Sequence, residues 1–133
     1  MRYLLDTCVI SDFVKGEVNT LQKIKATSPS QLSVSSLTVM EVKYGLHLNP
    51  AKAKKIEPIT EKLFSQIAII DFGIKEATTA AEIRNYLKKA GMPIGAYDLL
   101  IGATALSNQL GLVTANIKEF ERISNLLIEN WRL

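Results

Sequence analysis

Short apolar runs alternate along the chain with longer stretches in which apolar residues recur every three or four positions. The short runs predict buried strands, and the longer stretches predict amphipathic helices. The predicted strands cover residues 1–5, 31–35, 67–70, 111–114 and 126–128. The predicted helices cover residues 7–14, 18–25, 36–46, 51–65, 74–90 and 98–110. This alternation predicts an α/β fold with a central, mainly parallel sheet of five strands flanked by helices.

The helix that Asp98 opens is apolar on almost every side, so we expect it to be central and buried. Gly102 and the alanines after it permit a close approach of another backbone. A carboxylate entering such a helix is costly to desolvate unless it is paired, hydrogen-bonded or bound to a cation. Asp98 is therefore a candidate site residue.

Other polar residues have a position in the predicted fold similar to that of Asp98, because each lies just beyond a predicted strand or at the start of a helix. They are Asp6, Glu41, Asn116 and Glu119. In parallel α/β sheets, ligands bind outside the carboxyl ends of the strands, so we expect these side chains to meet at one edge. Crowded acids repel one another unless cations neutralise them. Oxygen ligands without a histidine or cysteine set favour Mg²⁺ or Mn²⁺ over Zn²⁺.

Each acid also has a structural interpretation. Asp6 has the position of an N-cap, and Glu41 lies three residues after Thr38, the spacing of a capping box. Asp71 also ends a predicted strand and is not excluded from the site. Thr7 and Thr114, beside the acids, either orient ligands or bond to local backbone, and the sequence is compatible with both roles.

Length and composition narrow the class of protein. The 133 residues suit one domain, which we take as 1–133, and no run of about 18 apolar residues is present to span a membrane. The N-terminal residues lack the pattern of a secretion signal, so we expect a cytoplasmic protein. The net charge of +3 is compatible with a nucleic-acid partner without requiring one. A nucleophilic pair of Cys8 with His47, the only histidine, is disfavoured because free cysteines beside strands are usually buried and unreactive.

Four segments, taken in order, resemble the PIN-domain ribonucleases and, among them, the VapC toxins of bacterial toxin–antitoxin pairs. The segments are Leu4 to Ser11, Ser35 to Gly45, Pro93 to Ile101 and Leu112 to Ile123. Each segment alone is a weak signal, but the four in order are specific, and the resemblance runs from one end of the chain to the other.

The resemblance implies a compact PIN fold and assigns Asp6, Glu41 and Asp98 as the acidic triad of a Mg²⁺ or Mn²⁺ site. Many PIN domains have a fourth acid where this chain has Asn116, which puts a second metal in doubt; Glu119 could supply the missing charge. The resemblance also implies hydrolysis of RNA, with tRNA as the substrate class, a VapB-type antitoxin and a homodimer. Cleavage by an activated water implies 5′-phosphate and 3′-hydroxyl products.

The expected antitoxin would place a segment in an apolar groove beside Glu41. We expect the helices 18–25 and 36–46 to build that groove, through residues such as Leu21 and Tyr44. A basic residue of the segment would then pair with the acidic site.

Other functional classes fit less well. A noncatalytic binding module would use the basic face of Lys52, Lys54 and Lys55, but retention of all three acids argues against it. A phosphatase with Asp6 as nucleophile would need an aspartate where the chain has Cys8. A dinucleotide-binding domain is also disfavoured, because residues 91–95 of this chain do not have the glycine spacing of that class.

Overall fold

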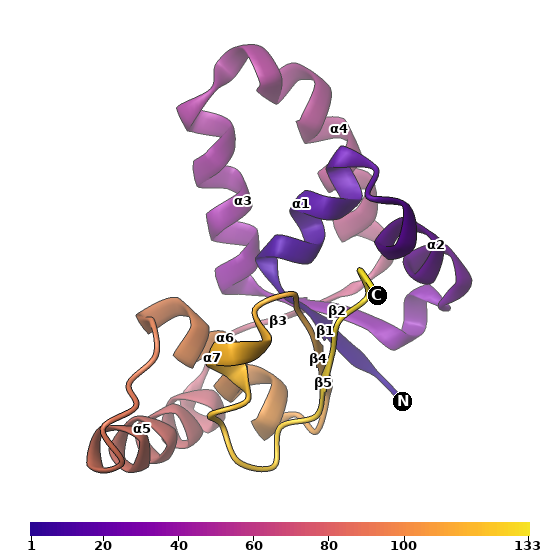
Figure 1. The fold of residues 1–133 in the computed structure, drawn as a ribbon. Coiled ribbons are helices and arrows are strands. Elements are labelled where there is room, and N and C mark those ends of the chain that lie inside the picture. Colours follow the sequence, from indigo (N-terminus) through magenta and orange to yellow (C-terminus); the bar gives the residue numbers. More distant parts are fainter.

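The computed structural model describes residues 1–133 and has the expected alternation of strands and helices (Figure 1). In chain order the elements are β1 (Tyr3–Leu5), α1 (Thr7–Lys15), α2 (Val18–Ala26), η1 (Pro29–Gln31), β2 (Leu32–Ser35), α3 (Ser36–Leu48), α4 (Pro50–Gln66), β3 (Ala68–Ile70), α5 (Ile74–Lys89), α6 (Ala96–Ser107), β4 (Gly111–Val113), α7 (Ile117–Phe120) and β5 (Ile128–Glu129). None of the helices is both long and apolar enough to cross a membrane.

The sheet has five strands in the order β3-β2-β1-β4-β5, and every neighbouring pair is parallel. β1 is the central strand: Tyr3 lies between Leu32 of β2 and Gly111 of β4. Because all strands point the same way, all their carboxyl ends meet at one edge of the sheet. The predicted α/β fold with a parallel sheet is confirmed.

Two apolar cores cover the two faces of the sheet. Leu4 and Leu112 face one core, with α5 and α6, whereas Leu5 and Val113 face the other, with α1, α2 and α4. Successive residues of a strand point to opposite faces, and these four side chains have no exposed surface. A central strand buried on both sides gives Asp6, the residue directly after it, a fixed position.

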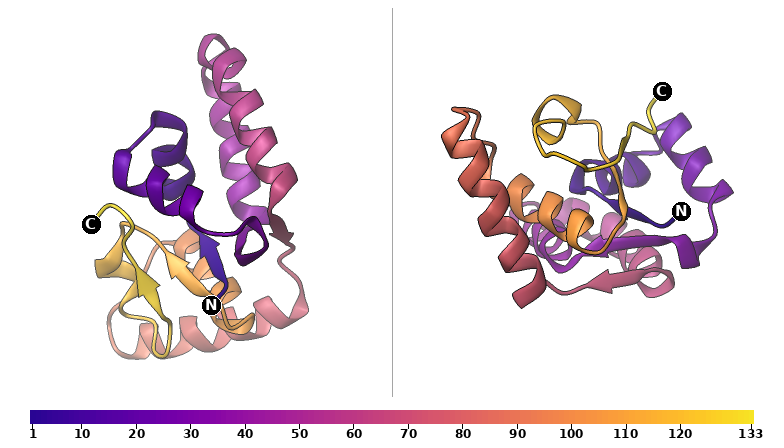
Figure 2. Two further views of the ribbon diagram at one scale, coloured as in Figure 1. Left: turned by 90° about the vertical axis from the view of Figure 1, so that its right-hand side faces the viewer. Right: turned by 90° about the horizontal axis from the view of Figure 1, so that it is seen from below.

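Helices α3 and α4 form a hairpin that extends away from the sheet (Figure 2). Asn49 separates the two helices, and its side chain accepts a hydrogen bond from the backbone N–H of Lys52. Helix α1 packs against both arms of this hairpin. Helix α1 and the hairpin therefore begin at the carboxyl edge of the sheet, where β1 leads into α1 and β2 leads into α3.

Helix α6 is central, as predicted, with residues 101–105 all buried. A Cβ atom added to Gly102 would lie only 2.5 Å from Ile123 Cδ1, so the segment after α7 packs directly on this glycine. The helix begins at Ala96, however, so Asp98 lies in its first turn and does not open it. The reason is local: the carbonyl of Gly95 already accepts a helical hydrogen bond from the N–H of Leu99, at 2.9 Å.

The last strand is also shifted from its predicted position. We expected residues 126–128, but β5 is Ile128–Glu129. Asn125 has φ of 68°, which turns the chain before the strand. Leu126 packs against the α5–α6 core, and pairing with β4 begins where the N–H of Leu112 donates to the carbonyl of Leu127.

Candidate functional site

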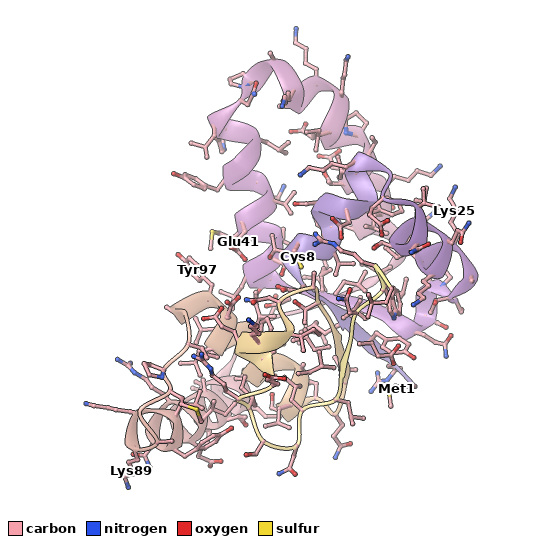
Figure 3. All side chains as sticks on the ribbon, in the orientation of Figure 1. Met1, Cys8, Lys25, Glu41, Lys89 and Tyr97 are labelled. Atoms are coloured by element: carbon pink, nitrogen blue, oxygen red, sulfur yellow. The ribbon has the colours of Figure 1, made fainter.

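The polar residues singled out in the sequence gather at the carboxyl edge of the sheet. β1 leads directly into Asp6, and the neighbouring strand β4 leads to Asn116. Glu41 lies in the second turn of α3 and Asp98 in the first turn of α6, and these two helices are in contact. Figure 3 labels Glu41 on α3 and, on α6, Tyr97, the residue that precedes Asp98.

Asp6 is 5% exposed and has a hydrogen-bond donor on each carboxylate oxygen. Its Oδ1 accepts from the backbone N–H of Thr7 at 2.8 Å, and its Oδ2 accepts from the hydroxyl of Thr114 at 2.7 Å. The N-cap interpretation of Asp6 is thus confirmed, since the bond from Thr7 caps α1. Neither ion pair of the structure includes Asp6, so this buried carboxylate has no basic side chain to balance it.

The Glu41 carboxylate is held by Thr7, whose hydroxyl is also in contact with that of Thr38. The Thr7 hydroxyl donates to Glu41 Oε1 at 2.7 Å and lies 3.1 Å from the Thr38 hydroxyl. The capping-box interpretation of Glu41 is wrong, because α3 starts at Ser36 and is capped by Ser35. Thr38 is buried inside the helix, and its hydroxyl contributes to the site instead, a role that the sequence did not signal.

Asp98 and Glu119 share one amide. The side-chain nitrogen of Asn116 donates to Asp98 Oδ2 at 3.2 Å and to Glu119 Oε2 at 2.8 Å. The other oxygen of Glu119 accepts from the backbone N–H of Gly95 at 3.0 Å. Asn116 therefore links α6 to α7, and its nitrogen faces the two acids.

The acids influence one another's protonation. Burial, followed by the neighbouring Glu119 carboxylate and the negative charges of Asp6 and Glu41, raises the pKa of Asp98 to about 7. Hydrogen bonds from Asp98, Asn116 and the Gly95 N–H lower the pKa of Glu119 to about 2. As the pH falls, Asp98 therefore takes up a proton well before Glu119 does. Asp6 and Glu41 lie close enough to Asp98 for their negative charges to contribute to its raised pKa.

The donor set fits a hard divalent cation by its chemistry, because it offers carboxylate, amide and hydroxyl oxygens. In the present arrangement, no three histidine, cysteine, aspartate or glutamate side chains are close enough to hold one metal ion. A cation would have to draw Asp6, Glu41 and Asp98 closer together than they lie here. The hydroxyls of Thr7 and Thr114 hold the Glu41 and Asp6 carboxylates in their orientations.

Cys8 and His47 form no nucleophilic pair. The Cys8 thiol lies 3.5 Å from Asp6 Oδ2 and 3.7 Å from the Thr114 hydroxyl, and accepts from the Ala115 N–H. Burial and the charge of Asp6 raise the pKa of this thiol, which keeps it protonated. His47 is exposed in the last turn of α3 and makes no hydrogen bond to the thiol.

Asp71, the remaining acid that follows a strand, is exposed. It comes after β3, the edge strand that is separated from β1 by β2. None of the hydrogen bonds within the site involves Asp71. The structure therefore leaves it outside the cluster.

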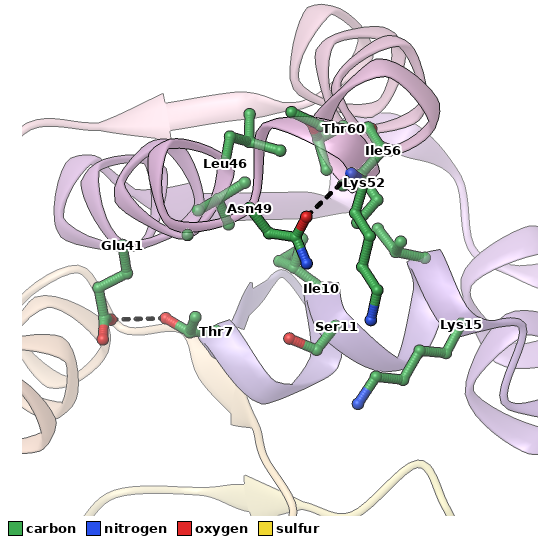
Figure 4. Close-up of a pocket in the computed structure, with 14 residues that line it drawn as sticks. Thr7, Ile10, Ser11, Lys15, Glu41, Leu46, Asn49, Lys52, Ile56 and Thr60 are labelled. Carbon is green, nitrogen blue, oxygen red and sulfur yellow. Dashed lines mark hydrogen bonds between the residues drawn. The ribbon is translucent and has the colours of Figure 1, made fainter.

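A groove of about 460 Å³ leads away from Glu41 between α1, α3 and α4 (Figure 4). It is lined by 14 residues: Thr7, Ile10, Ser11, Val14, Lys15, Glu41, Val42, Gly45, Leu46, Asn49, Lys52, Ala53, Ile56 and Thr60. We expected helix 18–25 as one wall, but no residue of α2 lines the groove. Ile24 of α2 is buried in the core, Tyr44 of α3 is 60% exposed to solvent, and α4 provides the second wall.

Comparison with known proteins agrees with this architecture. The PIN domain family matches residues 3–126. A ribonuclease VapC2 of Rickettsia felis is 38% identical, with 98% of each chain covered, and a tRNA(fMet)-specific endonuclease VapC of Salmonella typhimurium is 30% identical, again with 98% of each covered. The crystal structure of VapBC2 from Rickettsia felis bound to a promoter DNA fragment has a TM-score of 0.89 at 32% identity, covering 98% of this chain and 99% of that chain.

A match over residues 3–126, on a parallel sheet with acids at its carboxyl edge, defines the class of protein. The chain belongs to the PIN-domain family. Within that family, the relatives that it resembles over nearly full length are the VapC ribonucleases. The resemblance inferred from the four sequence segments is confirmed.

Proposed function

We propose that this protein is the toxin of a VapBC-type pair and that it hydrolyses RNA phosphodiester bonds as a metal-dependent endoribonuclease. The observation that carries the proposal is the convergence of Asp6, Glu41 and Asp98, which come from three distant segments of the chain. Their charges are close enough to contribute to the raised pKa of Asp98, and the ion pairs of the structure include none of them. A protein keeps such a cluster at little benefit to its stability, which favours a function for it.

Asp6, Glu41 and Asp98 would hold the cation, which we propose to be Mg²⁺ or Mn²⁺. Asn116 and Glu119 would hold a second one or orient water. A divalent cation held by these residues would lower the pKa of a water molecule and would neutralise charge on the leaving oxygen. Thr114 and Thr7 fix the orientation of the Asp6 and Glu41 carboxylates, and Asp98 releases its proton before it can act as a ligand.

The products follow from the bonds that change. Water adds to the phosphorus and the 3′ oxygen of the preceding nucleotide leaves with a proton, which gives a 5′-phosphate and a 3′-hydroxyl. No nucleophilic side chain is required, in keeping with the protonated thiol of Cys8. We propose tRNA as the substrate class, since one relative is named a tRNA(fMet)-specific endonuclease. We also propose that the protein acts in the cytoplasm.

The partner is a VapB-type antitoxin, by analogy with the VapBC complexes among the similar structures. A basic residue of the antitoxin would balance the acids, and apolar residues would pack on the floor of the groove, which includes Ile10, Val42 and Ile56. We also propose that the toxin forms a homodimer and that residues 1–133 are one PIN domain. Light scattering of the purified protein tests the oligomeric state.

Nuclease assays with total tRNA test the function. We expect cleavage with Mn²⁺ or Mg²⁺, none in excess EDTA, and recovery when the metal is restored; products should carry 5′-phosphates. Expression of the native chain without an antitoxin should arrest growth, whereas Asp6→Asn should be harmless at equal soluble expression. Cleavage that persists in EDTA would contradict the metal-dependent mechanism, and normal growth with the native chain would contradict the toxin assignment.

A further inference from the structure

The end of the groove that lies farthest from Glu41 carries two lysines. Figure 4 shows the side chains of Lys15, from α1, and Lys52, from α4, beyond Ser11 and on the opposite side from Glu41 and Thr7. Both lysines are exposed, and neither belongs to one of the ion pairs of the structure. The groove thus has carboxylate at one end and two free ammonium groups at the other.

Helix stability does not account for Lys52. It is the third residue of α4, whose first turn contains no acid. A cation in the first turn lies at the positive end of the helix dipole and is unfavourable there. Lys15, in the last turn of α1, is favourably placed with respect to its own helix. A ligand with negative charge would compensate the unfavourable position of Lys52.

We infer that Lys15 and Lys52 bind backbone phosphates of the RNA strand whose cleaved bond lies at the acidic cluster. This inference rests on the proposed function. A strand held at the cluster carries one negative charge per nucleotide, so whichever part of it enters the groove meets the lysines with a phosphate. Thr7 and Lys15 are eight residues apart on α1, which corresponds to about 12 Å along the helix. Roughly three stacked nucleotides, at about 3.4 Å each, span that length.

The remaining lining residues suit such a strand. The hydroxyl of Ser11 lies between the two ends of the groove (Figure 4) and can donate to a phosphate or ribose oxygen. The apolar side chains of Val14 and Ile56 can support ribose or base surfaces. Lys15 and Lys52 would therefore position the substrate without touching the bond that is cleaved.

The test compares two double variants. Lys15→Ala with Lys52→Ala removes the lysines of the groove, and Lys25→Ala with Lys54→Ala is the matched control, since those lysines are exposed on α2 and α4 and do not line the groove. Both variants lose the same net charge. Circular dichroism melts check that both remain folded.

Binding is measured first, by fluorescence anisotropy with a labelled oligouridine in EDTA, where nothing is cleaved. We expect the groove variant to bind several-fold more weakly than the control variant. The slope of log affinity against log salt should fall by about 0.7 for each lost phosphate contact. With total tRNA and Mn²⁺, KM should rise and kcat should stay unchanged.

Each alternative result has a definite meaning. Equal affinity and equal salt slopes in the two variants would overturn the inference even if the native chain cleaves RNA. Lysine-dependent oligouridine binding without metal-dependent cleavage would support phosphate binding by Lys15 and Lys52, but it would contradict the proposed nuclease function and overturn the part of the inference that places a cleaved bond at the acidic cluster. An oligoglutamate peptide could instead bind through Lys15 and Lys52 while the affinity for oligouridine is the same with and without these lysines. The groove would then recognise acidic protein, and the inference would be overturned.

Discussion

The two halves of the acidic cluster are built differently. On the side of α1 and α3, each acid has its own neutral donor: Thr114 for Asp6 and Thr7 for Glu41. On the side of α6 and α7, Asp98 and Glu119 share the amide of Asn116; the pKa of Asp98 is raised to about 7 and the pKa of Glu119 is lowered to about 2.

The difference separates two tasks. A carboxylate with its own hydroxyl donor is held in one orientation and stays ready to act as a ligand. Two carboxylates that share a donor compete for it, and one of them relieves the repulsion by taking up a proton. We therefore expect the first half to determine where a cation binds, and the second half to determine at which pH it binds.

The largest effect on RNA cleavage is expected when one of the triad acids is replaced, Asp6 in the first half of the cluster or Asp98 in the second. Asp6→Asn and Asp98→Asn should each lower RNA cleavage by more than about 100-fold, because loss of a mere supporting partner of a metal ligand already costs about 10–100-fold. Single-turnover assays with Mn²⁺ measure this, and thermal melts verify the fold. Asp71→Asn serves as the control, because Asp71 is exposed and outside the cluster. Native rates in both triad variants would remove these residues from the site.

A smaller effect on cation binding is expected when Asp6 or Glu41 loses the threonine hydroxyl that donates to it. Thr114→Val and Thr7→Val keep the side-chain shape but leave Asp6 Oδ2 or Glu41 Oε1 without its hydroxyl donor. Mn²⁺ affinity should fall about 10–100-fold, and Thr114→Val should also lower the free energy of unfolding by about 1–3 kcal/mol because its partner is buried. Isothermal titration calorimetry and denaturant melts measure the two effects. Thr78→Val, on exposed α5 surface, should change neither.

The second half predicts a pH dependence. Because the pKa of Asp98 is raised to about 7, a cation must displace a proton below that pH, and Mn²⁺ affinity should fall about tenfold per pH unit there. The folded, metal-free chain binds this proton more tightly than the unfolded chain, so the contribution of Asp98 to stability should decline as pH rises from about 4 to 7. Calorimetry and melts across this range test both. An affinity independent of pH from 5 to 8 would show that Asp98 does not control binding.

The smallest effect is expected at the shared amide. Asn116→Asp adds a carboxylate and removes the donor to Asp98 and Glu119, so Mn²⁺ should bind several-fold more tightly at pH 8 and more weakly at pH 6. Glu119→Gln should weaken binding slightly at pH 8. Calorimetry at both pH values is the measurement. Identical affinities in the native protein and both variants would exclude Asn116 and Glu119 from cation binding.

The sequence by itself determined the sheet, and with it the place where the acids gather. Apolar runs and helical periodicity are local signals, and parallel strands have their carboxyl ends at one edge whatever their order. Asp6 and Asn116 follow neighbouring strands for that reason. The exact first residue of α6 and the position of β5 were missed, because a carbonyl of Gly95 and a turn at Asn125 determine them.

Only the tertiary structure decided which side chains hold the acids and where the groove lies. From the sequence, Thr38 was interpreted as a capping residue, but Ser35 caps α3, and Thr38 lies inside the helix, where its hydroxyl contacts that of Thr7. The groove is walled by α4 and not by α2, because the α3–α4 hairpin packs against α1. Such packing depends on contacts between segments far apart in the chain, which no local periodicity records.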